Sequence, residues 1–264
     1  MKYSLFSILV LMLSLFFVSC SDDDDNGIVQ SGTLEIFFEP TYGTSGDLIN
    51  RTQNFEYADG NDIRIVVSEM FLGELKVGTG SEEMTLSEIE YIDLSDPVLD
   101  QSSGLTDKFI AFNDVPAGAY SSLEFGIGVP PGLNAMKPSD FGSTSPLSQS
   151  GLYWEAWDSY IFSKLEGRLD LAGDGSFSHL FSYHSGGDEV YRVLRVENLP
   201  LEIRPGETTR IKLTIDHREL LVRGADDYLD IENNPAAHHT GHLDIMNYLA
   251  DNYGSAFTIE FLTD

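Results

Sequence analysis

The sequence is poor in cysteine, since Cys20 is the only one among 264 residues. A single cysteine excludes an internal disulfide bond. If Cys20 is consumed by lipidation, no thiol is left to act as a nucleophile. The position of Cys20, directly after a hydrophobic run, therefore becomes the first clue to its role.

Lysine and arginine are also scarce, because 15 of them stand against 43 aspartate and glutamate residues. Such an acidic surface repels phosphate backbones and anionic lipid headgroups. We therefore expect no nucleic acid partner. Any attachment to a membrane should depend on a covalent lipid rather than on surface charge.

The common catalytic motifs are missing. The sequence has no G-x-S-x-G nucleophile elbow, no G-x-x-x-x-G-K phosphate loop and no H-E-x-x-H zinc motif. Carboxylates are too numerous for spacing alone to select an acid and base pair. The pattern Gly126-Ile127-Gly128 is followed by two prolines where a dinucleotide-binding helix would begin. We expect a protein that is not an enzyme.

The first hydrophobic run covers residues 5–18 and has the length of a signal-peptide core, too short for a permanent membrane span. It ends in Val18-Ser19-Cys20, which resembles a bacterial lipoprotein cleavage box, although Phe17 stands where that box usually has leucine. We predict that Cys20 is the lipidation site. The alternative is a buried, unmodified cysteine.

A block of four aspartates follows at residues 22–25 and should remain solvated rather than fold. We predict a signal peptide at residues 1–19 and an acidic tether at 20–31. An acidic run after the lipid-bearing cysteine resembles a signal for display on the outer surface, so we expect a surface-exposed outer-membrane lipoprotein. The alternative role of the run is a simple linker.

The rest of the sequence contains many short runs in which apolar and polar residues alternate, as Ile211, Leu213 and Ile215 do with their neighbours. Turn signals such as Gly173-Asp174-Gly175 separate the runs. We predict strands at residues 33–38, 63–72, 89–94, 109–112, 120–126, 160–171, 176–181, 191–196, 209–215 and 256–261.

One segment near the C-terminus has a helical pattern, with Leu243, Met246, Leu249 and Ala250 on one face and Gly254 where a helix would stop. Short strands with little helix favour a sandwich over a parallel α/β sheet. We therefore predict an all-β fold, an antiparallel β-sandwich of about ten strands with one short C-terminal helix. It should form a single domain over residues 32–264.

Both tryptophans, Trp154 and Trp157, lie in the aromatic segment at residues 151–167. This segment runs directly into the strand predicted at residues 160–171, which carries the acidic Glu166. The aromatic side chains should either line a binding site or only pack the sandwich.

The histidines are confined to the second half of the chain, and three of the six are crowded into the segment AHHTGH. Clustered imidazoles suit a late transition metal. A soft ion such as Cu(I) accepts two or three imidazoles, whereas a closed zinc site normally has four ligands. The candidate metal ligands are His184, His238, His239 and His242.

The remaining histidines are predicted to be structural. We expect His179 to point away from the core and His217 to lie at the end of a strand. For every histidine, a surface or hydrogen-bonded role is the alternative to metal binding.

Four motifs occur in a defined order along the chain. They are DVPAGAYSSLEFGIGVPPGLN, the aromatic segment GLYWEAWDSYIFSKLEG, FSYHSGG, and the histidine cluster before NYLADNYGSAFTIEF. In this order they resemble the MbnP-like family, and upstream NDIRIVVSEMFLGELKV and EYIDLSD are similar to its early strands. The resemblance spans most of residues 32–262, and the combination of FGIGV with the aromatic segment is its most specific part.

The resemblance implies an exported, non-catalytic β-sandwich linked to copper binding. It also implies a partner dihaem oxidase that converts a tryptophan near the copper to kynurenine, and Trp154 matches that position. The second tryptophan of the family falls where this chain has Ala156, so Trp157 is displaced by one residue and is expected to face solvent. The family also takes a copper ligand from the first half of the domain, where this chain has no histidine.

Two classes of function follow. The leading hypothesis is a lipid-anchored, copper-binding protein of the cell envelope, with Trp154 lining the site and with Met70 or Met136 as a soft substitute for the missing ligand. The alternative is a surface recognition lipoprotein that uses Tyr153 and Trp157 to bind a glycan or another outer-membrane component.

A third interpretation concerns acidic residues near the C-terminus. Hard cations such as calcium prefer oxygen ligands, but the spacing of these residues is not that of an EF-hand, and a solvated acidic face is the simpler explanation. The residues are Asp226, Asp227, Asp230 and Glu232.

Overall fold

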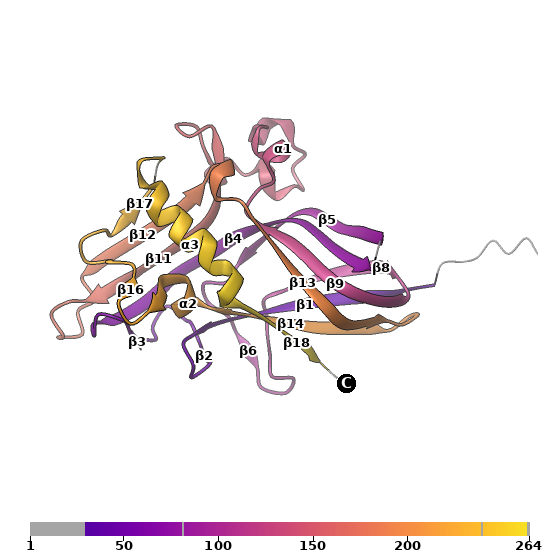
Figure 1. The fold of residues 1–264 in the computed structure, drawn as a ribbon, viewed down its shortest axis with the longest axis horizontal. Coiled ribbons are helices and arrows are strands. Elements are labelled where there is room, and N and C mark those ends of the chain that lie inside the picture. The colour runs from indigo at the N-terminus through magenta and orange to yellow at the C-terminus, as the bar shows by residue number, and fades with distance from the viewer. Residues whose placement is uncertain (1–29, 81, 239, 263–264) are drawn as a thin grey trace, which may run out of the picture.

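The computed structural model describes residues 30–80, 82–238 and 240–262 (Figure 1). Two main sheets contain most of the strands. The smaller sheet has the order β18-β14-β1-β2, and β8 also pairs with β1. Its strands are β1 (Ser31–Tyr42), β2 (Asp47–Leu48), β8 (Phe109–Pro116), β14 (Thr208–Asp216) and β18 (Phe257–Leu262).

The larger sheet has the order β13-β9-β4-β11-β12-β17, with β3, β5 and β10 paired to members of this path. Its strands are β3 (Phe55–Glu56), β4 (Asp62–Thr79), β5 (Glu82–Asp93), β9 (Gly118–Ile127), β10 (Tyr153–Trp154), β11 (Ser159–Asp170), β12 (His179–Gly186), β13 (Arg192–Ile203) and β17 (Ala236–Ala237). Two small ribbons pair β6 (Leu99–Asp100) with β7 (Leu105–Thr106), and β15 (Val222–Gly224) with β16 (Asp227–Tyr228).

The long strand β4 joins two parts of the larger sheet. Its residues 62–70 pair with β11, whereas its residues 72–78 pair with β9. The β9 and β13 part contributes to the sandwich with the smaller sheet, and the β11 and β12 part continues toward the opposite end of the molecule (Figure 1).

Helix α3 (Leu243–Ala256) covers one face of this second part (Figure 1). The other α-helices are α1 (Pro131–Asn134) and α2 (His217–Leu221). The short 3₁₀ turns are η1 (Pro138–Asp140), η2 (Pro146–Ser148), η3 (Ser150–Leu152), η4 (Asp188–Val190) and η5 (Thr240–His242). Helix α3 lies in front of β12 and close to α2 (Figure 1), so it buries the inner face of β12 and leaves the outer face uncovered.

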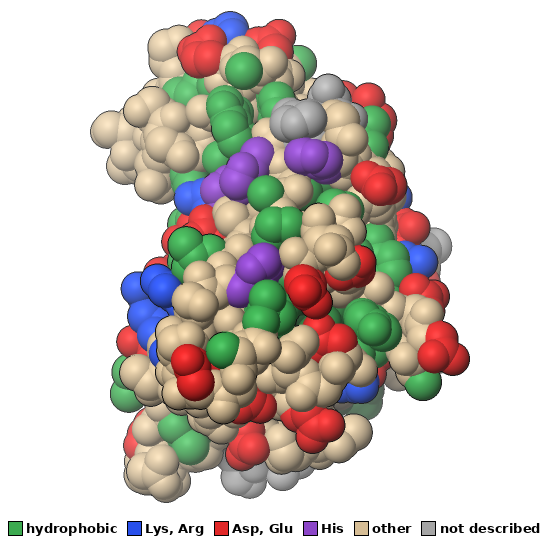
Figure 2. All heavy atoms as spheres, turned by 90° about the vertical axis from the view of Figure 1, so that its left-hand side faces the viewer, with side chains coloured by type: hydrophobic (Ala, Val, Ile, Leu, Met, Phe, Trp, Pro, Cys, Tyr) green, Lys and Arg blue, Asp and Glu red, His purple; other side chains and the backbone are tan. Residues whose placement is uncertain are grey.

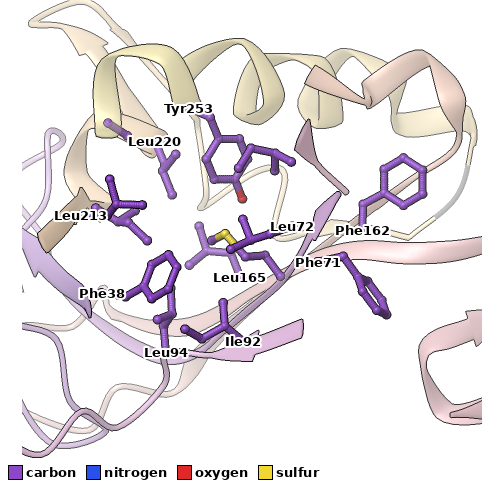
Figure 3. Close-up of a cluster of buried hydrophobic side chains, with 14 of the residues drawn as sticks. Phe38, Phe71, Leu72, Ile92, Leu94, Phe162, Leu165, Leu213, Leu220 and Tyr253 are labelled. Carbon is purple, nitrogen blue, oxygen red and sulfur yellow. The ribbon is translucent and has the colours of Figure 1, made fainter. Parts of the chain in front are cut away.

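The core forms where the two sheets and the helices meet. Figure 3 shows Phe38 and Leu213 of the smaller sheet facing Leu165 of β11, with Leu220 and Tyr253 approaching from the helices. All five side chains are buried. Burying a side chain of this size contributes about 1.5–3 kcal/mol, so this junction holds the helices against both sheets.

The predicted all-β fold is confirmed, and the predicted C-terminal helix is α3. Most strand pairs are antiparallel, but β1 pairs in parallel with β14, with Ile36 beside Ile211. Pairing of β12 with β17 is parallel as well. Local alternation indicates which residues form strands, but it does not determine the direction of a partner far along the chain.

The strand predicted at residues 176–181 is displaced. The carboxylate of Asp170 accepts the backbone N–H groups of Asp174 and Gly175, at 3.3 and 2.6 Å, and this holds the intervening residues in a loop. Strand β12 consequently starts at His179 and continues to Gly186. Among the described residues, no helix is both long enough and apolar enough to cross a membrane.

Candidate functional site

The candidate site lies on the uncovered outer face of β11 and β12. In β12, Tyr183 points into the core, whereas Ser182 and His184 on either side are half-buried and point outward. The antiparallel register places Glu166 opposite Ser182 and Lys164 opposite His184. Strand alternation therefore brings polar side chains of two neighbouring strands together on one surface.

A second imidazole comes from a distant segment. His238 directly follows β17, which runs parallel to β12, and its ring centre lies 4.7 Å from that of His184. The Ser182 hydroxyl oxygen Oγ lies 2.8 Å from Nε2 of His238 and 3.2 Å from Nε2 of His184. The two imidazoles thus converge on a single hydroxyl group.

The carboxylate of Glu166 fixes the hydrogen-bonding role of His184. Its Oε1 atom lies 2.6 Å from Nε2 of His184. An ionised carboxylate can only accept, so Nε2 of His184 carries the hydrogen and donates it. In the neutral ring, the free lone pair then belongs to Nδ1.

The pKa of His238 is lowered, mainly because burial disfavours its charged form. The neighbouring His184 lowers it further, while the charge of Glu166 acts in the opposite direction. The lowered pKa favours the neutral ring of His238, the form in which an imidazole can bind a metal ion.

A tight hairpin between β10 and β11 places Trp154 beside the histidine pair and Trp157 against Trp154. Trp154 pairs with Ser159 across the hairpin, and the Trp157 backbone N–H donates to the carbonyl of Trp154 at 2.9 Å. The ring centre of Trp154 lies 6.1 Å from that of His184 and 5.9 Å from that of His238. Seen from this end, the surface displays histidine side chains (Figure 2).

The expectation that Trp157 faces solvent is wrong. Its ring stacks on that of Trp154, with centres 4.6 Å apart and planes inclined by 30°. It also covers Gly186 so closely that a Cβ atom there would lie 2.9 Å from the indole. Trp157 is half-buried and supports Trp154 from the side of β12.

The other predicted ligands differ in their placement. His242 ends η5 and is close enough to contribute to the lowered pKa of His238. His239 lies outside the described residues, as does the predicted lipidation site Cys20. Met70 is 1% exposed within the core, so it cannot supply a ligand on the outer face. Met136 lies just after α1 and is exposed.

No group of three His, Cys, Asp or Glu side chains within residues 30–80, 82–238 and 240–262 has the arrangement to hold a metal ion. The acidic residues considered for calcium are included in that range. The carboxylate of Asp230 instead accepts hydrogen bonds from the side-chain amide of Asn233, at 2.9 and 3.1 Å. Among the described residues, the site therefore brings together a pair of imidazoles rather than a complete ligand set.

His217 is structural, as predicted. It is completely buried, with Nε2 at 2.8 Å from the hydroxyl of Ser68 and Nδ1 at 3.1 Å from the carbonyl of Thr41. Burial lowers the pKa of His217 to about 4. His179 was expected to point away from the core, and this is wrong, because it shares the inner face of β12 with Phe181 and its Nε2 lies 3.3 Å from a backbone carbonyl.

Two polar members of the site were missed in the sequence. Ser182 was given no role, and Glu166 was noted only as an acidic residue in a strand. The signal for Ser182 was its spacing of two residues from His184, which places both on one face of a strand. Glu166 required the register between β11 and β12, which local sequence does not specify.

These features define a β-sandwich protein with a surface site made of two imidazoles and two stacked indoles. The chain belongs to the MbnP family, whose model matches residues 31–240. Among solved structures, MbnP from Methylosinus trichosporium has a similar fold, with a TM-score of 0.55 at 12% sequence identity, and the match covers 89% of this chain and 100% of that chain. No curated protein matches the sequence.

Proposed function

We propose that this protein is a non-catalytic copper-binding protein of the cell envelope, anchored through a lipid on Cys20. The observation that carries the proposal is the convergence of His184, His238 and Trp154, from three separate segments, on one surface site. The resemblance to the MbnP-like family supports copper as the ion, because that family is linked to copper binding.

The donor set fits a soft, monovalent ion. Two imidazoles without a thiolate suit Cu(I), and their ring centres lie 4.7 Å apart. Since Nε2 of His184 donates to Glu166, the ligating atom of His184 would be Nδ1. Bound there, copper would supply a redox-active centre beside an indole ring. The chain's own contribution is to orient the imidazoles, with Glu166 holding His184 and Ser182 joining His184 to His238.

A competition titration of metal-free protein with Cu(I) and a chromophoric chelator tests the proposal. We expect His184→Ala and His238→Ala each to weaken Cu(I) binding at least about tenfold, because each removes one of two ligands. His179→Ala is the matched control, since His179 lies on the same strand but on its inner face. Wild-type affinity in both site variants would overturn the proposal.

The lipid anchor has its own test. Wild-type protein should fractionate with the outer membrane and be cleaved by protease added to intact cells, whereas Cys20→Ala should be released. The proposal rests on the hydrophobic run, the cleavage box and the acidic residues that follow it. Equal membrane retention of the two proteins would contradict it.

We also propose that a dihaem oxidase acts on Trp154, as the family resemblance implies. Trp154 suits this role because its ring lies beside both imidazoles. Conversion of an indole to kynurenine adds about 4 Da, which intact-mass measurement of protein from its native host would detect. Peptide mapping should place the change on Trp154, and an unchanged mass would exclude it.

A recognition function is the second candidate. The stacked pair of Trp154 and Trp157 is half-exposed, with the exposed carboxylates of Glu155 and Asp158 beside it, an arrangement that suits the face and hydroxyl groups of a sugar. A glycan array with wild-type protein and Trp157→Ala tests this function without metal. An array without signal would exclude glycans as the ligand.

A further inference from the structure

The segment between β9 and β10 contains one polar side chain that is almost completely buried. Asn134, the last residue of α1, is 6% exposed. Its Oδ1 atom accepts the backbone N–H of Tyr160 at 2.9 Å and the hydroxyl of Ser159 at 3.0 Å. Its Nδ2 group donates to the carboxylate of Asp188 at 2.8 Å.

These contacts join the two parts of the molecule that carry the site. Ser159 and Tyr160 begin β11 and form the hairpin that holds the tryptophans, with Ser159 paired directly to Trp154. Asp188 belongs to the turn that follows β12, and the N–H of the adjacent Gly187 donates to the Ser159 hydroxyl at 3.0 Å. One amide therefore connects the tryptophan hairpin to the end of the strand that carries His184.

Another contact to the hairpin is weaker. The ammonium group of Lys137 lies 2.8 Å from the carboxylate of Asp158 and 3.1 Å from the hydroxyl of Tyr153. The side chains of this ion pair are 49% and 78% exposed, and exposed pairs contribute only about 0–1 kcal/mol. Leaving the buried N–H of Tyr160 without a partner costs about 1–3 kcal/mol, so Asn134 is the stronger restraint.

The residues before Asn134 place its side chain at this junction. Gly128 has φ +108°, and a Cβ atom there would collide with the ring of Phe162. Pro131 then starts α1, and Asn134 ends it. The motif FGIGVPPGLN therefore has a structural purpose, which is to pack the segment against β11 and to place one amide at the junction.

We propose that Asn134 is the positioning residue that holds the indole of Trp154 next to the imidazole of His184. An amide has a donor and an acceptor, so it satisfies the hairpin and Asp188 at the same time. Aspartate would lose the donor and place two carboxylates against each other, and alanine would leave the N–H of Tyr160 unpaired. The effect on copper rests on the proposed function, whereas the effect on the tryptophans does not.

The test measures the tryptophan pair in metal-free protein. Two stacked indoles give an exciton couplet in circular dichroism, which Trp157→Phe should abolish and thereby assign. We expect Asn134→Ala to lose most of the couplet and to weaken Cu(I) binding on the order of tenfold, as loss of an outer-shell partner does. The matched control is Asn252→Ala, because Asn252 is also a buried asparagine, 4% exposed, and donates to Leu220 from within α3.

A merely structural role predicts a different result. In that case Asn134→Ala would lower the melting temperature as Asn252→Ala does, with an unchanged couplet and unchanged copper affinity, and the proposal would be overturned. If Asn134→Ala does not fold, Asp188→Ala replaces it, since Asp188 is exposed and only one hydrogen bond of Asn134 is lost. A reduced couplet in Asp188→Ala supports the proposal, and a wild-type couplet overturns it. If the wild-type protein binds no copper, the proposed function fails, but the couplet still decides the role of Asn134.

Discussion

Two regions of this molecule use histidine in opposite ways. In the interior, His217 bridges β1 and β4 through one hydroxyl and one carbonyl, and no water reaches it. On the outer face, His184 and His238 share the hydroxyl of Ser182 and are only partly buried beside a pair of indoles. In the interior, both ring nitrogens hold the fold together, whereas on the surface the two rings lie side by side and are proposed to bind a ligand. If stability and binding depend on separate histidines, substitutions should separate the two effects.

The largest effect is expected in the interior. His217→Ala removes a buried ring and leaves the hydroxyl of Ser68 and the carbonyl of Thr41 without their partner, which should lower the free energy of unfolding by about 3 kcal/mol. Urea denaturation measures this change. A loss below about 1 kcal/mol would mean that the site collapses around the missing ring.

The burial of His217 should also make the free energy of unfolding depend on pH. The pKa of His217 in the folded state is about 4, below the ordinary value of about 6.5, so the folded protein favours the neutral ring. The stability that comes from keeping His217 neutral is complete above pH 6.5 and is lost as the pH falls toward 4. At pH 5 the loss in the free energy of unfolding should be about 2 kcal/mol. Unfolding free energies of wild type and His217→Phe measured from pH 7 to pH 4.5 test this. Since the carboxylates are common to both proteins, parallel curves would contradict the assignment.

The carboxylate beside the surface pair should affect binding more than stability. Glu166→Ala removes the acceptor of the His184 N–H and should weaken Cu(I) binding on the order of tenfold. Glu166→Gln keeps an acceptor oxygen and should recover part of the loss. The same competition titration measures both, and equal affinities for Ala and Gln would show that charge rather than hydrogen bonding is the important property.

The smallest effect should come from the surface histidines themselves. Because the side chains of His184 and His238 are partly buried, whereas His217 is completely buried, alanine at either position should lower the free energy of unfolding by only about 1 kcal/mol in the absence of metal. Denaturation of the metal-free variants measures this. A loss comparable to that of His217→Ala would make the pair a structural feature and remove the contrast between the two regions.

The sequence predicted the parts of this arrangement that depend on local pattern. Alternation identified most strands, and a helical pattern identified α3. The crowding of imidazoles pointed to His238, the end of an apolar run before two glycines pointed to His184, and the family resemblance pointed to Trp154. The structure brings these three side chains together. The position of Trp157 was not predicted, because it depends on the absence of a side chain at Gly186 in another strand.

What remained unpredicted depends on contacts between distant segments. The parallel pairing of β1 with β14 follows from packing of the whole sandwich, and the contact of Glu166 with His184 follows from a register between two strands. Asn134 was visible only as the end of a motif. Its hydrogen bonds became clear once the hairpin and the turn after β12 were placed beside it.

The start of β1 has a consequence for how the protein would stand on a cell. The described chain enters β1 at one end of the long axis, where the carbonyl of Gln30 accepts the N–H of Ala117, whereas β12 and β17 lie at the other end (Figure 1). A lipid on Cys20 would therefore hold the domain by the end opposite the histidines. The site would then face away from the bilayer, toward molecules in solution. On anchored protein, a fluorophore at position 117 should be quenched by a lipid-borne quencher more strongly than one at position 180, and the reverse order would show that the molecule lies with its histidines toward the membrane.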